Sequence, residues 1–205
     1  MNRVLKALAV MAVLALSCSA GTMLTFSGSD AMSGPGDFVA GDFVTMNQTV
    51  SVTAIGIWDL NGDGLADTHG VRIYDLTTAT DVYNSTFAAG TGTLIDGFRY
   101  DNVASFLLTA GHSLVLMVDN RVGGNTDLMA YRLTGSSFDS AFTLVAGRFL
   151  NGSTISTLPT SDLVPGDVLA GINLQFGSSE SVPEPGSMLL LGTGLIGFAA
   201  FWRRR

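Results

Sequence analysis

The residues best suited to chemistry stand close together in the stretch DLNGDGLAD, which runs from position 59 to position 67. Side chains that carry oxygen recur there at Asp59, Asn61, Asp63 and Asp67, and a glycine follows the third of them. This alternation directs oxygen atoms toward one centre, and the glycine permits a sharp turn, as in the first half of a calcium-binding loop. The four residues are therefore candidate ligands for Ca²⁺, which would stiffen the loop rather than catalyse a reaction.

The same stretch also has the composition of an ordinary turn. The twelfth position of a calcium loop is normally a glutamate, but here it is Gly70, and the preceding His69 is a poor calcium ligand. No flanking helices are predicted. Aspartate, asparagine and glycine are the residues that turns between strands favour. The sequence leaves a metal site and an acidic turn both open.

Trp58 lies directly before the acidic stretch, at the end of a predicted strand. An aromatic ring in this position is a candidate for stacking on a sugar ring. With Ca²⁺ in the neighbouring loop, the pair would form a calcium-assisted carbohydrate-binding module for exopolysaccharide. The alternative is an aromatic side chain that packs in the core or across strands.

Support for catalysis is thin. His69 and His112 are the two histidines of the chain, and neither a Gly-x-Ser-x-Gly nor a His-Glu-x-x-His sequence occurs. Both glutamates, Glu180 and Glu184, stand near the C-terminus, so a polysaccharide hydrolase would need two aspartates as its acid and base. We expect a protein that is not an enzyme, and a hydrolase is the third hypothesis.

These candidate residues must be positioned by strands. Segments rich in β-branched and aromatic residues recur between positions 49 and 176, each bounded by Gly, Asp, Asn, Thr or Pro. The predicted strands are Thr49–Ile57, Val71–Tyr74, Val82–Phe87, Leu94–Tyr100, Ser113–Val118, Leu128–Leu133, Ala141–Phe149 and Val168–Phe176. No segment shows an apolar stripe of helical period and length. We predict an all-β fold, an antiparallel β-sandwich of jelly-roll type, over residues 21–178.

We predict no strand in two further stretches of residues 21–178. The segment 36–45 contains a twin pentad, GDFVA followed by GDFVT, which is too short to indicate a repeat architecture. Ser153–Pro165 is polar and is expected to be a long surface loop.

Acidic charge dominates residues 21–178. Five arginines stand there against fifteen aspartates, a formal charge near −10, whereas the whole chain carries −7. Such a surface repels phosphate groups, which excludes nucleic acid as a partner. It favours solubility and the binding of divalent cations.

The first 20 residues have the pattern of a secretory signal peptide. Arg3 and Lys6 precede the apolar run Ala7–Leu16, and small residues follow up to Ala20, after which we expect cleavage. Lipidation at Cys18 is the alternative. Because Cys18 is the single cysteine of the chain, the mature protein would contain no disulfide.

Residues 179–205 combine three parts of a membrane signal. A polar hinge contains Val182, Pro183, Glu184 and Pro185, the uncharged segment Gly186–Trp202 follows, and Arg203, Arg204 and Arg205 end the sequence. A helix of these 17 residues would be about 26 Å long at ~1.5 Å per residue, short for a hydrocarbon core of ~30 Å. The arginines favour the cytoplasmic side, which places residues 21–178 outside the cytoplasm.

In this order and composition, the C-terminal segment resembles the PEP-CTERM sorting signal of Gram-negative bacteria. The resemblance implies processing by exosortase near Pro183–Pro185 during export, often alongside the production of extracellular polysaccharide. The two prolines would keep the processing segment extended.

The region 36–120 also resembles an uncharacterised β-sandwich domain of exported bacterial proteins that carry this signal. The likeness rests on Trp58-Asp59 and on the segments 71–75, 96–100 and 108–111. It implies a fold and no activity.

Together these features predict an exported, non-enzymatic β-sandwich protein of the cell surface or the extracellular matrix of a biofilm. Its expected partners are exosortase and the export machinery, the inner membrane for a limited time, and exopolysaccharide.

Overall fold

The computed structural model describes residues 21–32, 38–120, 127, 129–151, 154–159, 161–162 and 168–178. Within these ranges the regular elements are all β-strands and none is a helix, which confirms the all-β prediction. The part of the chain that the structure describes accordingly holds no helix long and apolar enough to span a bilayer. The expected signal helix at 1–20 and membrane helix at 186–202 lie outside the described residues.

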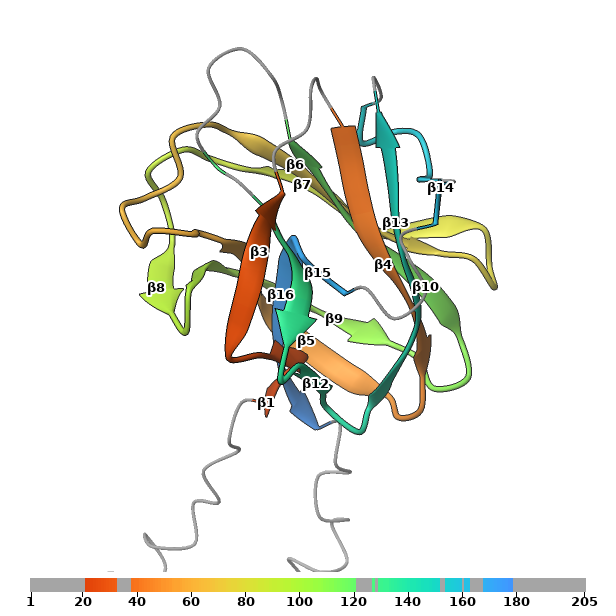
Figure 1. Ribbon diagram of the computed structural model, residues 1–205. Helices are drawn as coiled ribbons and strands as arrows, with labels where there is room; N and C mark the ends of the chain where they lie inside the picture. The colour runs from red at the N-terminus through yellow and green to blue at the C-terminus, as the bar shows by residue number, and fades with distance from the viewer. Residues whose placement is uncertain are drawn as a thin grey trace, which may run out of the picture.

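Sixteen strands follow one another along the described chain (Figure 1). They are β1 (Gly21–Thr22), β2 (Leu24–Thr25), β3 (Gly28–Met32), β4 (Phe38–Met46), β5 (Val50–Trp58), β6 (His69–Asp75), β7 (Thr80–Phe87), β8 (Thr93–Ile95), β9 (Phe98–Leu108), β10 (Ser113–Asn120), β11 (Met129–Thr134), β12 (Ser137–Phe138), β13 (Phe142–Asn151), β14 (Ser161–Asp162), β15 (Leu169–Ala170) and β16 (Ile172–Ser178).

Two larger sheets form the body of the protein. One has five strands in the order β1-β16-β5-β9-β8, and the other has six in the order β14-β13-β4-β10-β6-β7. Two small sheets, β15-β11-β3 and β12-β2, accompany them. Neighbouring strands run antiparallel in each described pairing, as the sequence predicted.

One hydrophobic core joins the two larger sheets. Ile55 of the five-stranded sheet and Ile73 and Leu116 of the six-stranded sheet belong to the same buried cluster, and each is at most 2% exposed. Burial of an aliphatic side chain of this size contributes about 1.5–3 kcal/mol to folding. A second, smaller cluster of Val39, Phe43, Val115 and Met117 has Ile155 and Leu158 packed against it. The stretch expected as a polar surface loop thus contributes two apolar side chains to the packing.

Strand β4 is buried on both faces and was not predicted, because Gly41 and Asp42, which favour turns, interrupt its apolar run. Phe38 and Val44 belong to the large core cluster, whereas Val39 and Phe43 belong to the small one. Successive side chains of a strand point to opposite faces, so a strand covered on both sides shows no alternation of apolar and polar residues. Residues 38–45 of the twin pentad lie in this one strand.

The predicted strand Leu94–Tyr100 is wrong as a single element. Asp96 and Gly97 have φ angles of 50° and 82° and form a two-residue turn between β8 and β9. Positive φ at both positions is typical of the tight hairpin turns in which Asp-Gly is preferred. The chain therefore reverses in the middle of what the sequence pattern showed as one apolar run.

A bulge in β5 determines which residues reach the core near the acidic stretch. The register of β5 shifts between Val52 and Ala54 against both of its neighbours, β16 and β9. Beyond the bulge, Ile55 lines a cavity together with residues of the six-stranded sheet, whereas Trp58 packs against Phe26. An extra residue in one strand changes which side chains face each side, and beyond the bulge Trp58 packs at the edge of the large core cluster.

Candidate functional site

The acidic stretch forms the loop between β5 and β6 and is folded around the carboxylate of Asp59. This side chain accepts hydrogen bonds from the backbone N–H of Gly62 and of Gly64, each at 3.0 Å, and from Arg99 Nε at 2.7 Å. Asp59 is 4% exposed. Gly62 and Gly64 have φ angles of +69° and +107°, a region that other residues rarely adopt. The glycines of the motif therefore allow the backbone to turn around one buried carboxylate.

Arg99 of β9 completes this arrangement from the neighbouring strand. Besides its contact with Asp59, its Nη2 donates to the carbonyl oxygen of Gly62 at 2.9 Å. The guanidinium thus neutralises the carboxylate and satisfies a backbone acceptor of the same loop. A charged pair with extra hydrogen bonds of this kind is costly to break, because the remaining partner stays partly buried and unpaired.

A second carboxylate holds the other half of the loop. Asp127 Oδ2 accepts hydrogen bonds from the backbone N–H of Ala66 at 2.9 Å and of Asp67 at 3.0 Å. It also lies 3.1 Å from His69 Nε2. Asp127 is about 60 positions away from Ala66 and Asp67 in the sequence. The loop is therefore held by Asp59 at its own start and by Asp127 from the region after β10.

His69 lies between two hydrogen-bond acceptors. Its Nδ1 is 2.8 Å from the backbone oxygen of Asp119, and its Nε2 faces the Asp127 carboxylate. A carbonyl oxygen and an ionised carboxylate both accept and do not donate. The two contacts are therefore both hydrogen bonds when the imidazole carries two protons or when Asp127 is protonated. His69 is 2% exposed.

The four candidate calcium ligands differ in their surroundings. Asp59 is buried and already accepts three hydrogen bonds, Asn61 and Asp63 are exposed, and Asp67 is half-buried. The described residues contain no group of three or more His, Cys, Asp or Glu side chains arranged to hold a metal. The geometry around Asp59 favours the acidic turn, and the Ca²⁺ site stays a prediction.

Trp58 is packed by other aromatic rings. Its ring centroid lies 4.8 Å from that of Phe26 and 5.1 Å from that of Phe98. A Cβ atom at Gly97 would overlap the indole ring of Trp58, so the turn before β9 lies directly against this ring. The indole Nε1 is buried and has no hydrogen-bond partner among the described residues. This packing favours the core interpretation, and sugar stacking on Trp58 stays a prediction.

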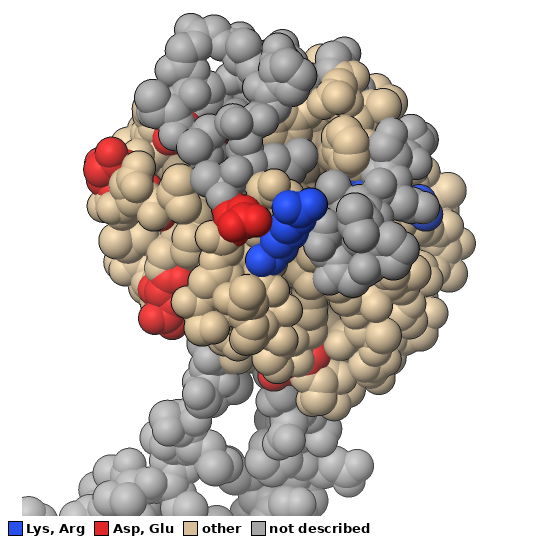
Figure 2. All heavy atoms as spheres, viewed as in Figure 1, with Lys and Arg blue, Asp and Glu red and all other residues tan. Residues whose placement is uncertain are grey.

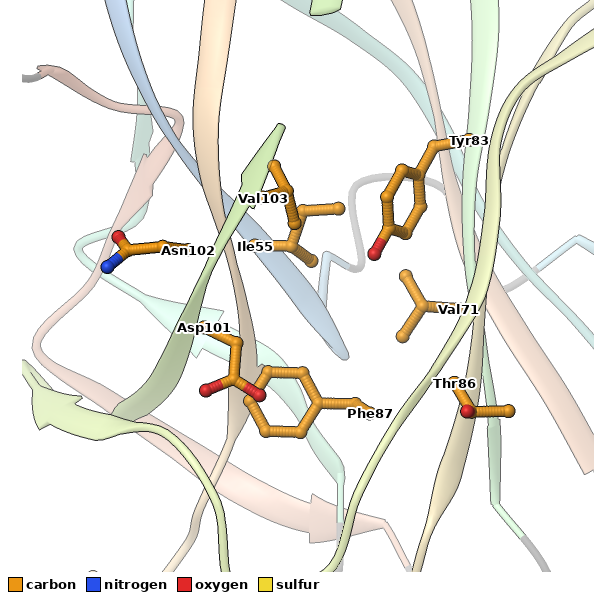
Figure 3. Close-up of a pocket in the computed structure, with 8 residues that line it drawn as sticks. All are labelled: Ile55, Val71, Tyr83, Thr86, Phe87, Asp101, Asn102 and Val103. Atoms are coloured by element: carbon orange, nitrogen blue, oxygen red, sulfur yellow. The ribbon is translucent and has the colours of Figure 1, made fainter. Parts of the chain in front are cut away.

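A pocket of about 160 Å³ lies between the two larger sheets, where β7 and β9 approach each other (Figure 3). Ile55, Val71, Phe87 and Val103 supply apolar surface, while the Tyr83 hydroxyl and the Asp101 carboxylate point toward the same space. Thr86 and Asn102 complete the lining. The pocket combines apolar surface with a few polar groups, the usual composition of a small-molecule site.

A larger pocket of about 320 Å³ lies beside the N-terminal strands. Phe26, Phe98 and Tyr100 give it aromatic surface, and Asp96 lies on the same lining. The remaining lining residues are Thr22, Leu24, Thr25 and Asn173. Burial, together with the negative charge of Asp96, raises the pKa of the Tyr100 hydroxyl above its usual range. Tyr100 therefore acts at neutral pH as a hydroxyl donor and acceptor and not as an anion.

Another buried carboxyl group lies in the middle of β4. Asp42 is 1% exposed, and the backbone N–H of Leu169 lies 3.4 Å from its Oδ1. Burial raises the pKa of Asp42 from its ordinary value near 3.8 to about 8, and the hydrogen bond from Leu169 opposes this only in part. The side chain is thus a neutral acid over most of the physiological range.

Comparison with known proteins bears on the C-terminal segment. A family model described as the PEP-CTERM protein-sorting motif matches residues 181–205. This confirms the resemblance that Val182–Pro185 and Arg203–Arg205 carry in the sequence. These residues lie outside the described part of the structure. No curated protein matches the chain.

Sequence reasoning found Asp59 but missed the residues that act with it. Arg99 and Asp127 are 40 and 68 positions away, and nothing in the spacing of either points to the loop. His69 was noted only as a poor calcium ligand. Its position directly after the loop, at the start of β6, was the one available signal that it takes part in this site.

Proposed function

We propose that this protein is a non-enzymatic β-sandwich of jelly-roll type that is sorted to the cell surface or the extracellular matrix by exosortase. The observation that carries the proposal is the PEP-CTERM protein-sorting motif at residues 181–205. It begins three positions after Ser178, the last residue of β16. The sorting signal therefore follows the folded body almost without a linker.

Two features of the body support this proposal. The two larger sheets share one hydrophobic core, which suits a domain that must remain folded outside the cell. Residues 21–178 contain no cysteine, so their stability rests on burial and hydrogen bonding and does not depend on oxidation. The precursor is held in the inner membrane by residues 186–202 until it is processed.

The test is intact-mass analysis of the protein recovered from its native cells. We expect a species that begins near Gly21 and ends near Pro183–Pro185. Replacement of Pro183, Glu184 and Pro185 by alanine should leave the unprocessed precursor in the inner membrane. Release of this variant at the normal rate, with the normal mass, would contradict the proposal.

A second candidate function is the binding of carbohydrate, with exopolysaccharide as the ligand. The pocket between β7 and β9 favours it, because a carboxylate, a tyrosine hydroxyl and apolar side chains line one small space (Figure 3). Its volume of about 160 Å³ suits one sugar ring rather than a chain segment.

Glycan binding by residues 21–178 tests this second function. Asp101→Asn should abolish binding if the pocket is the site, whereas Asp63→Ala should abolish it if the acidic loop supplies Ca²⁺. Asp30→Asn is the matched control at an exposed carboxylate. Absence of binding to every glycan, including the polysaccharide of the host, would contradict carbohydrate binding. Turnover of the polysaccharide would instead establish the hydrolase.

A further inference from the structure

Three turns at one end of the body contain no aspartate, glutamate, lysine or arginine. They are the turn 47–49 between β4 and β5, the turn 76–79 between β6 and β7, and the turn 109–112 between β9 and β10. Their sequences are NQT, LTTA and TAGH. Nine of these eleven residues are exposed, and Thr49 and His112 are half-buried. We call the surface of these three turns the neutral end.

Hydrogen bonds join the three turns into one surface. The backbone N–H of Ala110 donates to Thr49 Oγ1 at 3.0 Å, which links the turn after β9 to the turn after β4. The backbone N–H of Ser113 donates to Thr77 Oγ1 at 3.0 Å, which links the start of β10 to the turn after β6. The neutral end is therefore continuous across both larger sheets.

Three carboxylates flank the neutral end, and each accepts a hydrogen bond. Asp75 lies 2.7 Å from His112 Nδ1, Asp81 lies 2.6 Å from Arg72 Nε, and Asp139 accepts from the N–H of Ala141 at 2.9 Å. Burial acts to raise the pKa of Asp75, but hydrogen bonds from His112, Thr77 and Thr78 outweigh it and hold the pKa below its usual value.

The opposite end of the body is acidic. Asp59, Asp63 and Asp67 stand in the loop after β5, Asp96 lies in the turn after β8, and Asp127 contacts the same loop. We call this surface the acidic end. In Figure 2 acidic residues lie on the left, near the centre and in the lower centre of this face, and the lower right of the view shows none. The turns after β6 and β9 lie at the right and lower right in Figure 1.

The chain toward the sorting motif leaves the body at the neutral end. Ser178 pairs with Val50, the residue that follows the turn 47–49. Strand β16 is paired with β1 on one side and with β5 on the other, and its pairing with β5 extends to Ser178. Gly21 pairs with Phe176, and the first described residue therefore lies at the same end (Figure 1).

The connection from the body to the apolar segment is short. Eight residue steps separate Ser178 from Gly186, and a fully extended chain of that length spans at most about 29 Å. Five steps separate Ser178 from Pro183, at most about 18 Å. The apolar segment therefore begins within about 29 Å of Ser178, and Pro183 lies within about 18 Å of it.

We propose that in the membrane-held precursor the neutral end faces the lipid headgroups and the acidic end points away from the bilayer. The proposal rests on the proposed function, because it requires a precursor held by residues 186–202. Exposed carboxylates lose hydration at a crowded surface and are repelled by anionic lipids within a Debye length of ~10 Å. Amide, hydroxyl and methyl groups meet the headgroups without that cost.

Two matched alanines allow a direct test. Ala110 lies at the neutral end, and Ala89 lies in the loop whose Gly90 donates to Leu65 O at the acidic end. Both are exposed. In full-length protein with Cys18→Ser, Ala110→Cys and Ala89→Cys are each labelled with one fluorophore. The protein is reconstituted in vesicles of phosphatidylcholine and phosphatidylglycerol that contain a lipid with a quencher on its headgroup. We expect several-fold stronger quenching at position 110 than at position 89.

The outcomes separate the inference from the function on which it rests. If the protein floats with the vesicles and both labels are quenched equally, the proposed orientation is wrong although the membrane-held precursor stands. If the protein does not float with the vesicles, both fail. A third protein, Ala110→Cys with Gln48→Asp, places a carboxylate on the neutral end and should reduce quenching at position 110. No reduction would also count against the inference. Thermal unfolding of each variant confirms that the body remains folded.

Discussion

Two carboxylates that are almost inaccessible to solvent lie in regions of opposite character. Asp59, 4% exposed, stands at the start of the acidic loop and accepts hydrogen bonds from two backbone N–H groups and from Arg99. Asp42, 1% exposed, stands in the middle of β4, with one N–H of Leu169 at 3.4 Å. The comparison shows that burial alone does not determine the role of an aspartate. The hydrogen-bond donors around its carboxyl group determine that role.

Because of those donors, the carboxylate of Asp59 holds the acidic loop together, whereas ionisation of Asp42 would destabilise the region around β4. The Asp59 carboxylate is the acceptor around which the loop turns, so its removal should open the loop. A charged Asp42 has almost no compensation, so the folded protein should favour its neutral form. Variants and pH can separate these two roles.

The largest expected effect is a pH dependence that comes from Asp42. Its pKa is raised to about 8 in the folded protein, so between pH 4 and pH 8 the folded state binds more protons than the unfolded state. Stability is therefore greatest below pH 4 for this group and falls as pH rises through 8. The difference of about four pH units between the two pKa values corresponds to on the order of 5 kcal/mol. Urea unfolding at pH 5, 7 and 9 measures it.

Asp42→Asn should remove most of this slope, because its side chain does not ionise. At pH 9 the variant should be more stable than the parent protein by a few kcal/mol. Asp63→Asn, at an exposed position of the acidic loop, should keep the parental slope. Parallel pH profiles for Asp42→Asn and the parent would show that Asp42 is not neutral in the folded protein.

The second effect in size concerns the acidic loop itself. Asp59→Ala removes three hydrogen bonds and leaves Arg99, whose side chain is 20% exposed, without its carboxylate. We expect a loss of about 3 kcal/mol, near the lower bound for breaking a buried pair because Arg99 is partly hydrated. In a body of this size that corresponds to roughly 6–12 °C in melting temperature.

Asp63→Ala is the matched control in the same loop, since Asp63 is exposed. It should change stability by no more than about 0.5 kcal/mol. Equal losses from the two variants would mean that the loop is held by the acidic cluster as a whole. In that case the contrast between Asp59 and the exposed carboxylates would have no energetic basis.

The contrast between these regions also marks how far the sequence alone could lead. Strands β5 and β10 were predicted because β-branched and other apolar residues recur in them between turn residues, although both faces of β10 are covered. Strand β4 was missed because Gly41 and Asp42, which favour turns, interrupt its apolar run. The hairpin at Asp96-Gly97 was missed because two apolar residues precede it and an aromatic follows, so the run looked continuous.

The candidate site was predictable only in its local part. The spacing of Asp59, Gly62 and Gly64 identified a loop that turns around oxygen ligands. Whether those ligands meet a cation or N–H groups depends on Arg99 and Asp127, which only the folding of β9 and β10 brings near. The sorting motif was predictable in full, because its order along the chain is its whole signal.

A third prediction compares the two His–Asp contacts. His69 has both ring nitrogens near acceptors and is 2% exposed, whereas His112 contacts Asp75 and its side chain is 27% exposed. His69→Phe keeps an aromatic ring and removes the contacts of both ring nitrogens, with the backbone oxygen of Asp119 and with Asp127 Oδ2. We expect a loss of about 2 kcal/mol for His69→Phe and about 1 kcal/mol or less for His112→Phe. Chemical unfolding at pH 6 measures both, and a larger loss for His112→Phe would reverse the assignment of the stronger contact.

The smallest expected effect is that of Ca²⁺. Since Asp59 is occupied by Arg99 and two N–H groups, a cation would rely on Asn61, Asp63 and Asp67, and its affinity should be low. With a dissociation constant on the order of 1 mM, 5 mM Ca²⁺ stabilises the folded state by about 1 kcal/mol, or roughly 2–4 °C. Asp63→Asn should abolish this shift in a thermal melt, and Asp30→Asn, at an exposed carboxylate outside the loop, should keep it. No shift in the parent protein would leave the loop as a turn held by Asp59 and Asp127 alone. A shift that survives Asp63→Asn would place the cation elsewhere on the acidic surface.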